Sequence, residues 1–260
     1  MKKTIKKIIL RFFDPIAFKL GYRKIEQLNN KIDVIDTYNK SNLLHCFYQI
    51  LKTVNFTPKH IVDIGANHGT WTRDALIFFP HCIYTLLEPQ AQMKESIKYL
   101  LDSNPNISFN AVGAGKKTGL FKFTIVDRDD SCNFRYSEEE AKENGFSQIK
   151  VPVITLNELI SEKGLCVPDI IKIDAEGLDI EVLEGSSNFF GKTEIFMIEA
   201  GVVNKIFDNS FLSLINFMDD KGYRLFEITD LNRPFKTAVL WLVELVFVKK
   251  EGMIDSYKWI

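Results

Sequence analysis

The segment IVDIGANHGTWT, Ile61 to Thr72, is the most informative part of the chain. It begins as an apolar run typical of a buried strand, breaks at Gly65, and continues as a helical pattern. Strand, glycine turn and helix in this order form the first unit of sheets that bind ligands beyond the carboxyl ends of their strands. We therefore ask whether the rest of the chain repeats this alternation.

Apolar runs and helical patterns do alternate along the chain. Strands are predicted at HIVDIG, CIYTLLE, ISFNAVG, GLFKFTIV, KVPVIT, DIIKID, EIFMIEA, YRLFEIT and LVELVFVKK, and helices over 72–79, 90–101, 156–162, 178–190 and 211–220. This order predicts an α/β fold with a mostly parallel, doubly wound sheet flanked by helices. Residues 1–56 are predicted to form a helical N-terminal extension and residues 57–260 the sheet domain.

Composition and charge narrow the class of protein. The chain has 260 residues, 46% of them hydrophobic, which is enough for one sizeable core. Its formal net charge of -1 provides no positive field, so we expect no nucleic-acid partner. Four widely spaced cysteines without a CxxC pair indicate reduced thiols in a cytoplasmic protein.

Residues 1–24 have a pattern of their own. Lysines surround a short apolar run, no small-residue cleavage site follows, and the run is too short to cross a membrane. The spacing predicts a basic amphipathic helix. Two interpretations remain open: peripheral contact with the inner face of a membrane, or an arm docked on its own domain or on a second subunit of an oligomer.

The turn after the first strand indicates its ligand. A dinucleotide-binding turn needs G-x-G-x-x-G, but counting from Gly65 the second and third glycine positions hold Asn67 and Thr70. Asp63 would face a pyrophosphate unfavourably and would pair well with an ammonium group. S-adenosylmethionine, with an amino acid at one end and a nucleoside at the other, fits this pattern better than NAD does.

The next two strand ends fit the nucleoside. Glu88 closes the second strand roughly 20 residues past the turn, where an acidic residue can accept hydrogen bonds from ribose hydroxyls. Asn110, Ala111 and Val112 close the third strand and could line an adenine slot. A solvent-exposed strand-end glutamate is the alternative interpretation of Glu88.

Taken together, IVDIGANHGT, LLEPQ, FNAVGAGKKTG, VPVITLNEL and DIIKIDAEGLDIEVLEG resemble the FkbM family of S-adenosylmethionine-dependent methyltransferases, over about Thr57 to Ala200. The resemblance implies a Rossmann-like class I methyltransferase whose seven-stranded-type sheet ends in an antiparallel hairpin. It also implies O-methylation of hydroxyls on sugars, glycans, glycolipids or related metabolites. The cofactor roles that it implies fall on Asp63, Gly65, Ala66, Asn67, Gly69, Glu88, Asn110, Ala111 and Val112. His68 stands where such sequences often have an apolar residue.

Two carboxylates are candidates for catalysis. An alcohol that accepts a methyl group must lose a proton, which a nearby carboxylate or imidazole can take. Asp174 closes the strand IIKID and Glu176 lies in the following turn, so both are predicted at the same edge of the sheet as Asp63. The alternative is that Asp174 pairs with Lys172 or caps a helix and that Glu176 is a solvated acid of the first helical turn. His68 is a further candidate base, with a purely structural role in the turn as its alternative.

Other residues leave more than one interpretation. Glu199 could contact the acceptor or only end its strand. The polar stretch DRDDSCNFRYSEEE, with Ser131, Asn133 and Arg135, could fold over the site as a lid or form a surface loop. No metal site is expected, because the nearby acids Asp174, Glu176 and Asp179 lack recognisable ligand spacing. Alternative functions are N-methylation, protein methylation, and a non-catalytic or NAD-binding Rossmann module.

Overall fold

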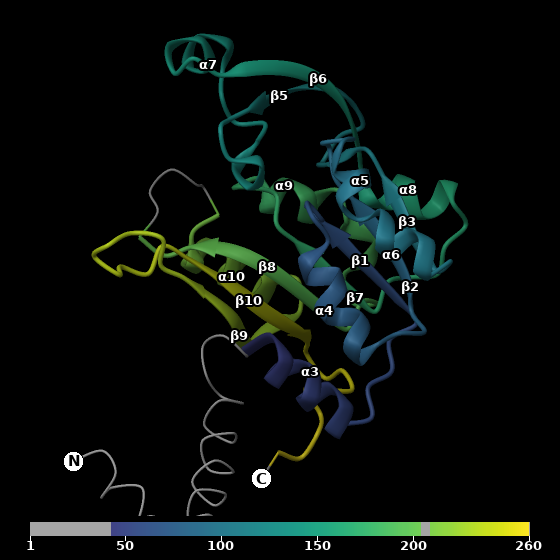
Figure 1. Cartoon of the computed structure of the whole chain (residues 1–260). Coiled ribbons are helices and arrows are strands. Elements are labelled where there is room, and N and C mark those ends of the chain that lie inside the picture. The colour runs from purple at the N-terminus through teal and green to yellow at the C-terminus, as the bar shows by residue number, and fades with distance from the viewer. Residues whose placement is uncertain (1–42, 204–208, 260) are drawn as a thin grey trace, which may run out of the picture. The chain divides into compact units, whose positions relative to one another are not determined.

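The computed structural model of the chain describes residues 43–203 and 209–259 (Figure 1). The predicted helix in residues 1–24, and most of the predicted extension 1–56, lie outside these ranges. The chain divides into the units Met1–Cys46 and Phe47–Ile260, and the second holds the sheets. Helix α3, Leu43–Thr53, spans the division. Within the described ranges, no helix combines the length and apolar character needed to cross a membrane.

Seven strands form the main sheet, in the order β3-β2-β1-β7-β8-β10-β9. Their bounds are β1 His60–Ile64, β2 Ile83–Leu87, β3 Ile107–Asn110, β7 Ile170–Ile173, β8 Ile195–Gly201, β9 Tyr223–Asn232 and β10 Leu242–Lys249. The first five strands in this order are parallel, whereas β10 is antiparallel to both β8 and β9. The predicted mostly parallel α/β sheet with an antiparallel hairpin is confirmed. Because the chain order reverses beside β1, a ligand site is expected at the ends of β1 and β7.

One face of this sheet is apolar and covered by helices α8, Leu156–Glu162, α9, Asp179–Glu184, and α10, Phe211–Asp220. Alternate strand residues such as Ile64, Ile173, Ile198, Leu245 and Phe247 pack with these helices in the main hydrophobic cluster. Strand side chains alternate between the two faces, so the intervening residues lie on the opposite face.

The opposite face carries charged residues inside the strands. Asp63 of β1 is the register partner of Lys172 of β7, and Glu199 of β8 is the register partner of Glu244 of β10. Asp63 and Lys172 are both buried. Since a buried charge is costly without a partner, this face must contain compensating contacts.

The remaining predicted helices, 72–79 and 90–101, differ from the structure in their bounds. Helix α4, Thr70–Phe78, begins at the glycine turn as expected. The predicted helix 90–101 is split at Ile97 into α5, Met93–Ser96, and α6, Lys98–Ser103.

A second sheet contains β4, Gly113–Ala114, β5, Gly119–Ile125, and β6, Ser147–Ile154, in the order β4-β6-β5. The strands β5 and β6 form an antiparallel hairpin that extends away from the main sheet, with helix α7, Glu138–Glu143, near its far end (Figure 1). The first four residues of β5 are exposed, whereas all five of β1 are buried. A strand in the middle of a parallel sheet must be buried on both faces, which β5 cannot satisfy.

Candidate active site

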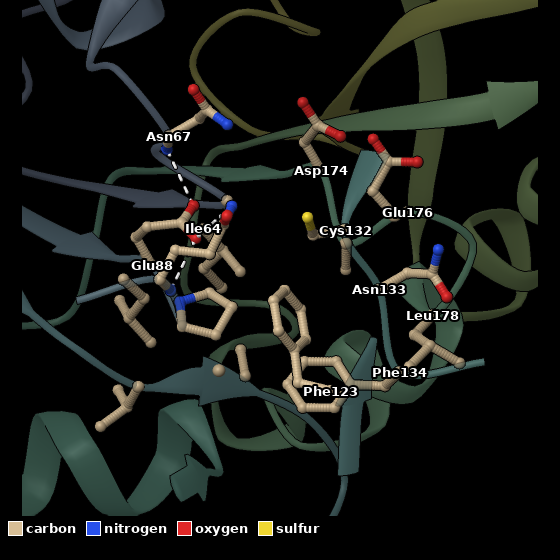
Figure 2. Close-up of a pocket in the computed structure, with 18 of the residues that line it drawn as sticks. Ile64, Asn67, Glu88, Phe123, Cys132, Asn133, Phe134, Asp174, Glu176 and Leu178 are labelled. Carbon is tan, nitrogen blue, oxygen red and sulfur yellow. Dashed lines mark hydrogen bonds between the residues drawn. The ribbon is translucent and has the colours of Figure 1, made fainter. Parts of the chain in front are cut away.

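A cavity lies at the carboxyl ends of β1, β2 and β7, where the strand order reverses. It has a volume of about 100 Å³ and lies within a wider hollow of about 650 Å³ that includes open solvent. Figure 2 shows two regions in its wall. Asn67 and Glu88 face the carboxyl groups of Asp174 and Glu176 across the polar part.

The other region of the wall is aromatic. Phe123 of β5 and Phe134 lie edge to face, with ring centroids 4.7 Å apart. Both rings line the cavity below its polar groups in Figure 2. The hairpin outside the main sheet therefore supplies an apolar surface for a flat ligand group.

The glycine turn holds the end of β1 against β2. Gly65 has a φ of 75° and donates its backbone N–H to the carbonyl of Leu87 at 3.0 Å. Gly65 and Asn67 line the cavity, while Ala66 is buried beside them. Gly69 does not line it; a Cβ there would lie 2.7 Å from the side chain of Ile97. The predicted turn residues thus divide into two that face the cavity and two that pack behind it.

Glu88 is fixed from both sides. Its carboxylate oxygens accept the backbone N–H groups of Asn67 and Gln90, each at 2.9 Å. Burial raises the pKa of Glu88, and the hydrogen bonds from Gln90 and Asn67 oppose this shift. The lone pairs that remain on these oxygens can accept hydrogen bonds from a ligand hydroxyl.

The three predicted residues after β3 do not all reach the cavity. Val112 lines it, but Asn110 and Ala111 do not. The Asn110 side chain donates to the carbonyl of Leu86 at 2.9 Å and so ties the end of β3 to β2.

Asp63 lies below the cavity floor. Its side chain is fully buried, accepts the Thr72 hydroxyl at 2.6 Å, and lies 3.5 Å from the Lys172 ammonium. It is not among the residues that line the cavity. Lys172 also lies 3.1 Å from a carboxylate oxygen of Asp174, which does line it. The sequence indicated Lys172 only as a partner of Asp174, and its contact with Asp63 follows from the strand register.

Glu176 lies in the turn after β7 with a φ of 52°. Burial, followed by the negative charges of Asp174, Asp179 and Asp130, raises its pKa to about 8, against a smaller opposing effect of Arg135. Asp179 has a different role: it accepts the backbone N–H groups of Ala175 and Gly177 at 3.0 and 3.2 Å and so stabilises the turn.

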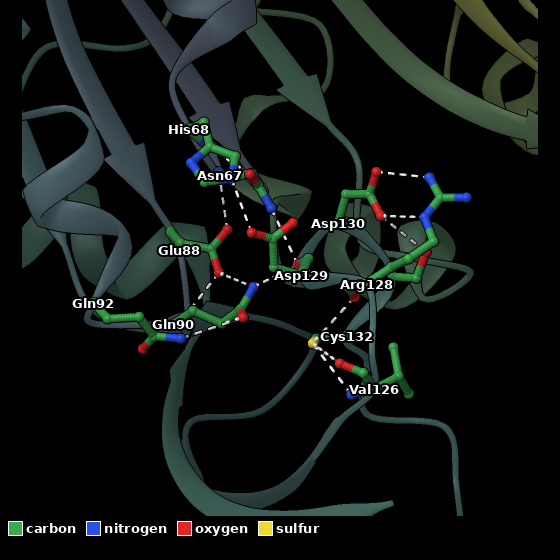
Figure 3. Close-up of polar contacts among 11 residues, drawn as sticks. Asn67, His68, Glu88, Gln90, Gln92, Val126, Arg128, Asp129, Asp130 and Cys132 are labelled. Carbon is green, nitrogen blue, oxygen red and sulfur yellow. Dashed lines mark hydrogen bonds and ion pairs between the residues drawn. The ribbon is translucent and has the colours of Figure 1, made fainter.

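The loop 126–135 covers one side of the cavity, and Asp129 is its point of attachment (Figure 3). The Asp129 carbonyl accepts the side-chain amides of Asn67 at 3.1 Å and Gln90 at 2.8 Å. Its carboxylate lies 2.9 Å from the imidazole Nε2 of His68. His68 does not line the cavity, so the geometry connects it to the loop.

Of the three residues singled out in the polar stretch, Asn133 lines the cavity and Ser131 and Arg135 do not. Asp129, Asp130, Cys132 and Phe134 from the same loop also line it. The acceptor in both contacts of Asp129 is its backbone carbonyl. Every residue has such a carbonyl, so the sequence could not single out Asp129 for this role.

Glu199 lies near this site on β8. One of its carboxylate oxygens is buried without a hydrogen-bond partner. Burial raises the pKa of Glu199 well above its ordinary value, and the charges of Asp174 and Glu176 add to the shift. Among the described residues, no group of three or more His, Cys, Asp or Glu side chains is arranged to hold a metal ion.

Comparison with known proteins identifies one family model. Residues 63–225 match the methyltransferase FkbM domain. No match is found among curated proteins.

Solved structures of methyltransferases are similar to the chain. The FkbM methyltransferase from Methylobacillus flagellatus KT is 19% identical over 73% of this chain and 43% of that chain, with a TM-score of 0.49. The precorrin-6y C5,15-methyltransferase from Geobacter metallireducens is 13% identical over 77% of this chain and 84% of that one, with a TM-score of 0.43. The 1,6-didemethyltoxoflavin-N1-methyltransferase from Burkholderia thailandensis, solved with bound 1,6-didemethyltoxoflavin and S-adenosylhomocysteine, is 12% identical over 91% and 90%, with a TM-score of 0.44. The chain thus spans less than half the length of the first of these proteins.

Proposed function

Because the chain belongs to the FkbM family of methyltransferases, we propose that it transfers a methyl group from S-adenosylmethionine to a hydroxyl of a sugar, glycan or related metabolite. The observation that carries this proposal is the arrangement of carboxylates in one cavity. Glu88 faces Asp174 and Glu176 across its polar part (Figure 2). Glu88 can bind the ribose of a nucleoside, and Asp174 and Glu176 can orient a reacting hydroxyl and accept its proton.

The residues present fit S-adenosylmethionine. Glu88 offers carboxylate oxygens to the ribose hydroxyls, and the rings of Phe123 and Phe134 offer an apolar surface to adenine. Asn67 and Asp174 would face the amino-acid end, whose ammonium group suits a carboxylate. When bound, this cofactor supplies a methyl group activated by a sulfonium sulfur.

Asp63 would contribute indirectly to this site. Its carboxylate already accepts Thr72 and pairs with Lys172, and the side chain is buried below the floor. We therefore assign it to holding the turn that carries Gly65 and Asn67. Ala66 and Gly69 support the same turn by packing.

The roles of the two catalytic candidates follow from their partners. Asp174 is paired with Lys172 at 3.1 Å, so its carboxylate is already engaged by a cation. Glu176 has a pKa of about 8, close to the value that favours general base catalysis near neutral pH. We propose that Glu176 accepts the proton of the hydroxyl and that Asp174 orients the hydroxyl and the cofactor.

The acceptor and its location are part of the proposal. Polyhydroxyl compounds donate hydrogen bonds to carboxylates, and the acidic wall disfavours a phosphate beside the reacting hydroxyl. The net charge of -1 argues against nucleic acid. We place the enzyme in the cytoplasm, with residues 1–24 contacting a membrane surface that would present a glycolipid acceptor.

The first test is ligand binding. Calorimetric titrations with S-adenosylmethionine, S-adenosylhomocysteine and NAD should give heat with the first two. Binding of NAD alone would reject the proposal.

The second test is turnover. Transfer of a labelled methyl group should be measured on a panel of sugars, nucleotide sugars, glycolipids, amines and peptides. We expect labelled sugar ethers in the native protein and in Glu162→Gln, a control at an exposed position. Glu176→Gln should lose most of the activity, and label found only on amines would favour N-methylation instead.

A further inference from the structure

Lys172 is a buried charge in the middle of the sheet. Its side chain is 5% exposed, and it lies on the charged face between β1 and β8. Three oxygens surround its ammonium group: Asp174 Oδ2 at 3.1 Å, the carbonyl of Gly65 at 3.3 Å and Asp63 Oδ1 at 3.5 Å. The ammonium donates hydrogen bonds to Asp174 and Gly65, and its contact with Asp63 is an ion pair without a hydrogen bond.

The three acceptors belong to different parts of the proposed site. Gly65 is in the turn that lines the cofactor cavity, Asp174 is on the adjoining acidic wall, and Asp63 lies below the floor. Lys172 itself does not line the cavity. It therefore connects two walls of the site and can act on a ligand only through its neighbours.

Other charges face this group from the neighbouring strands. Glu244 of β10, like Asp174 and Asp63, attracts the ammonium group of Lys172. The positive charge of Lys172 in turn lowers the pKa values of Glu199 of β8 and of Glu88, which follows β2. Burial alone would lower the pKa of Lys172, but Asp174, Asp63 and Glu244 together raise it above its ordinary value. Lys172 is therefore a permanent cation at physiological pH.

Asp174 in turn meets mostly negative groups. Its charge raises the pKa values of Glu176, Asp179, Glu199 and Glu244. Among the ion pairs formed by described residues, its one cationic partner within 4 Å is Lys172. Without that partner, the carboxylate of Asp174 would be repelled by the surrounding carboxyl groups.

Resting on the proposed function, we propose that Lys172 is a positioning residue: it keeps Asp174 ionised and fixed on the cavity wall, so that Asp174 binds the cationic end of S-adenosylmethionine instead of accepting the proton of the hydroxyl. Glu176 is then the carboxyl group of this wall that is left to exchange a proton. Asp63 is the second carboxylate that forms an ion pair with the lysine.

The variant Lys172→Met removes the charge and keeps much of the side-chain volume. It is best studied with Glu176→Gln, which removes the other titrating group of the wall. Glu176→Gln alone gives the reference profile of affinity for S-adenosylmethionine between about pH 8 and pH 5.5, because Asp179 and Glu244, whose pKa values are raised to about 7, remain in both proteins. With Lys172→Met added, Asp174 should take up a proton in this range and the affinity should fall by about tenfold or more.

Two further variants keep the test decisive. Asp63→Asn/Lys172→Met removes the buried anion that Lys172→Met leaves unpaired, and should show the same added pH dependence if the single variant folds poorly. Replacing Asp174 by Asn in the Lys172→Met background should abolish that added dependence. Carboxyl NMR of the protein without ligand should show Asp174 titrating at higher pH in Lys172→Met than in the native protein.

Lower stability with an unchanged Asp174 titration and an unchanged pH dependence of binding would make Lys172 a structural residue and overturn the proposal. A native protein that binds no S-adenosylmethionine at any pH would instead overturn the proposed function, and this proposal with it.

Discussion

Gly65 and Asp174 approach so closely at the ends of β1 and β7 that no side chain fits between them. A Cβ at Gly65 would lie 2.0 Å from the carbonyl oxygen of Asp174. The contact joins the turn that would hold the cofactor to the wall that would hold the acceptor. Glycine is therefore required at position 65 for steric as well as conformational reasons, because its φ is also positive.

Gly65→Ala should consequently separate the two strand ends and reduce cofactor binding. A methyl group at 2.0 Å from backbone cannot be accommodated without moving β1 or β7. We expect S-adenosylhomocysteine affinity to fall by about tenfold or more, measured by calorimetry, with a lower melting temperature.

Gly191→Ala is the matched control for this change. Gly191 has the same φ of 75°, but a Cβ there meets no atom within 4 Å. It should cost only the strain of the left-handed conformation, about 1–2 kcal/mol, without loss of affinity. Equal loss of affinity in both variants would contradict the steric explanation.

Glu176→Gln should change the protons released when the cofactor binds. With a pKa of about 8, Glu176 is mostly protonated at neutral pH, and a bound cation would lower that pKa and expel the proton. Calorimetry in buffers of different ionisation enthalpy should detect release of about half a proton or more near pH 7 in the native protein. Glu176→Gln should release few protons on binding. If it released as many as the native protein, the protons would come from another group.

Much of the fold could be predicted from the sequence because strands and helices have different periods. Local patterns indicate the strand runs and the turn at Gly65. The final antiparallel hairpin is implied by the resemblance to the FkbM family. The placement of β10 between β8 and β9 was not predicted, since strand order depends on long-range pairing. The hairpin of β5 and β6 was also assigned to the main alternation, because an apolar run does not reveal which sheet it joins.

The candidate site was predicted less completely, for a related reason. The sequence placed Asp63, Glu88, Asp174 and Glu176 at strand ends, but it could not tell which of them face a common cavity. Alternation along β1 turns Asp63 toward Lys172 and below the floor, a fact that depends on the register of two strands distant in sequence. The raised pKa of Glu176 likewise needs burial and carboxylates from separate segments.

Loosening the attachment of loop 126–135 should speed the release of the cofactor. His68→Ala removes the hydrogen bond between the imidazole and the Asp129 carboxylate and leaves the two amide contacts to the Asp129 carbonyl. Because both partners are about half exposed, the effect should be small, about twofold to fivefold in the dissociation rate of S-adenosylhomocysteine.

A second histidine tests this explanation. His81→Ala, at an exposed position in the turn before β2, should leave the rate unchanged. A strong effect on affinity for the acceptor alone would instead indicate that His68 acts on the substrate.

His60 should make folding stability depend on pH. Its ring is fully buried, with Nδ1 2.8 Å from the carbonyl of Cys166 and Nε2 2.9 Å from the Thr85 hydroxyl. A carbonyl can only accept, so Nδ1 carries the proton and Nε2 accepts from Thr85 in the neutral ring. Protonation would replace that acceptor by a donor inside the protein, and burial accordingly lowers the pKa of His60 below its ordinary value.

The sign of the effect follows from this lowered pKa. The unfolded chain binds the proton more readily, so the contribution of neutral His60 is complete above its unfolded pKa, about 6.5. It is lost as the pH falls from there through the lower folded value. The raised pKa values of Glu176 and Glu244 act in the opposite direction, since they favour the folded state at low pH. Only a difference between two proteins can therefore isolate His60.

His60→Gln supplies that difference, because an amide retains a donor and an acceptor and cannot be protonated in this range. Free energies of unfolding should be measured with urea from about pH 7.5 to about pH 5 for both proteins. The contributions of Glu176 and Glu244 cancel in the comparison, so the advantage of the native protein over His60→Gln should shrink as the pH falls. His81→Ala should follow the native curve. A constant difference between native protein and His60→Gln would mean that the pKa of His60 is the same in the folded and unfolded states.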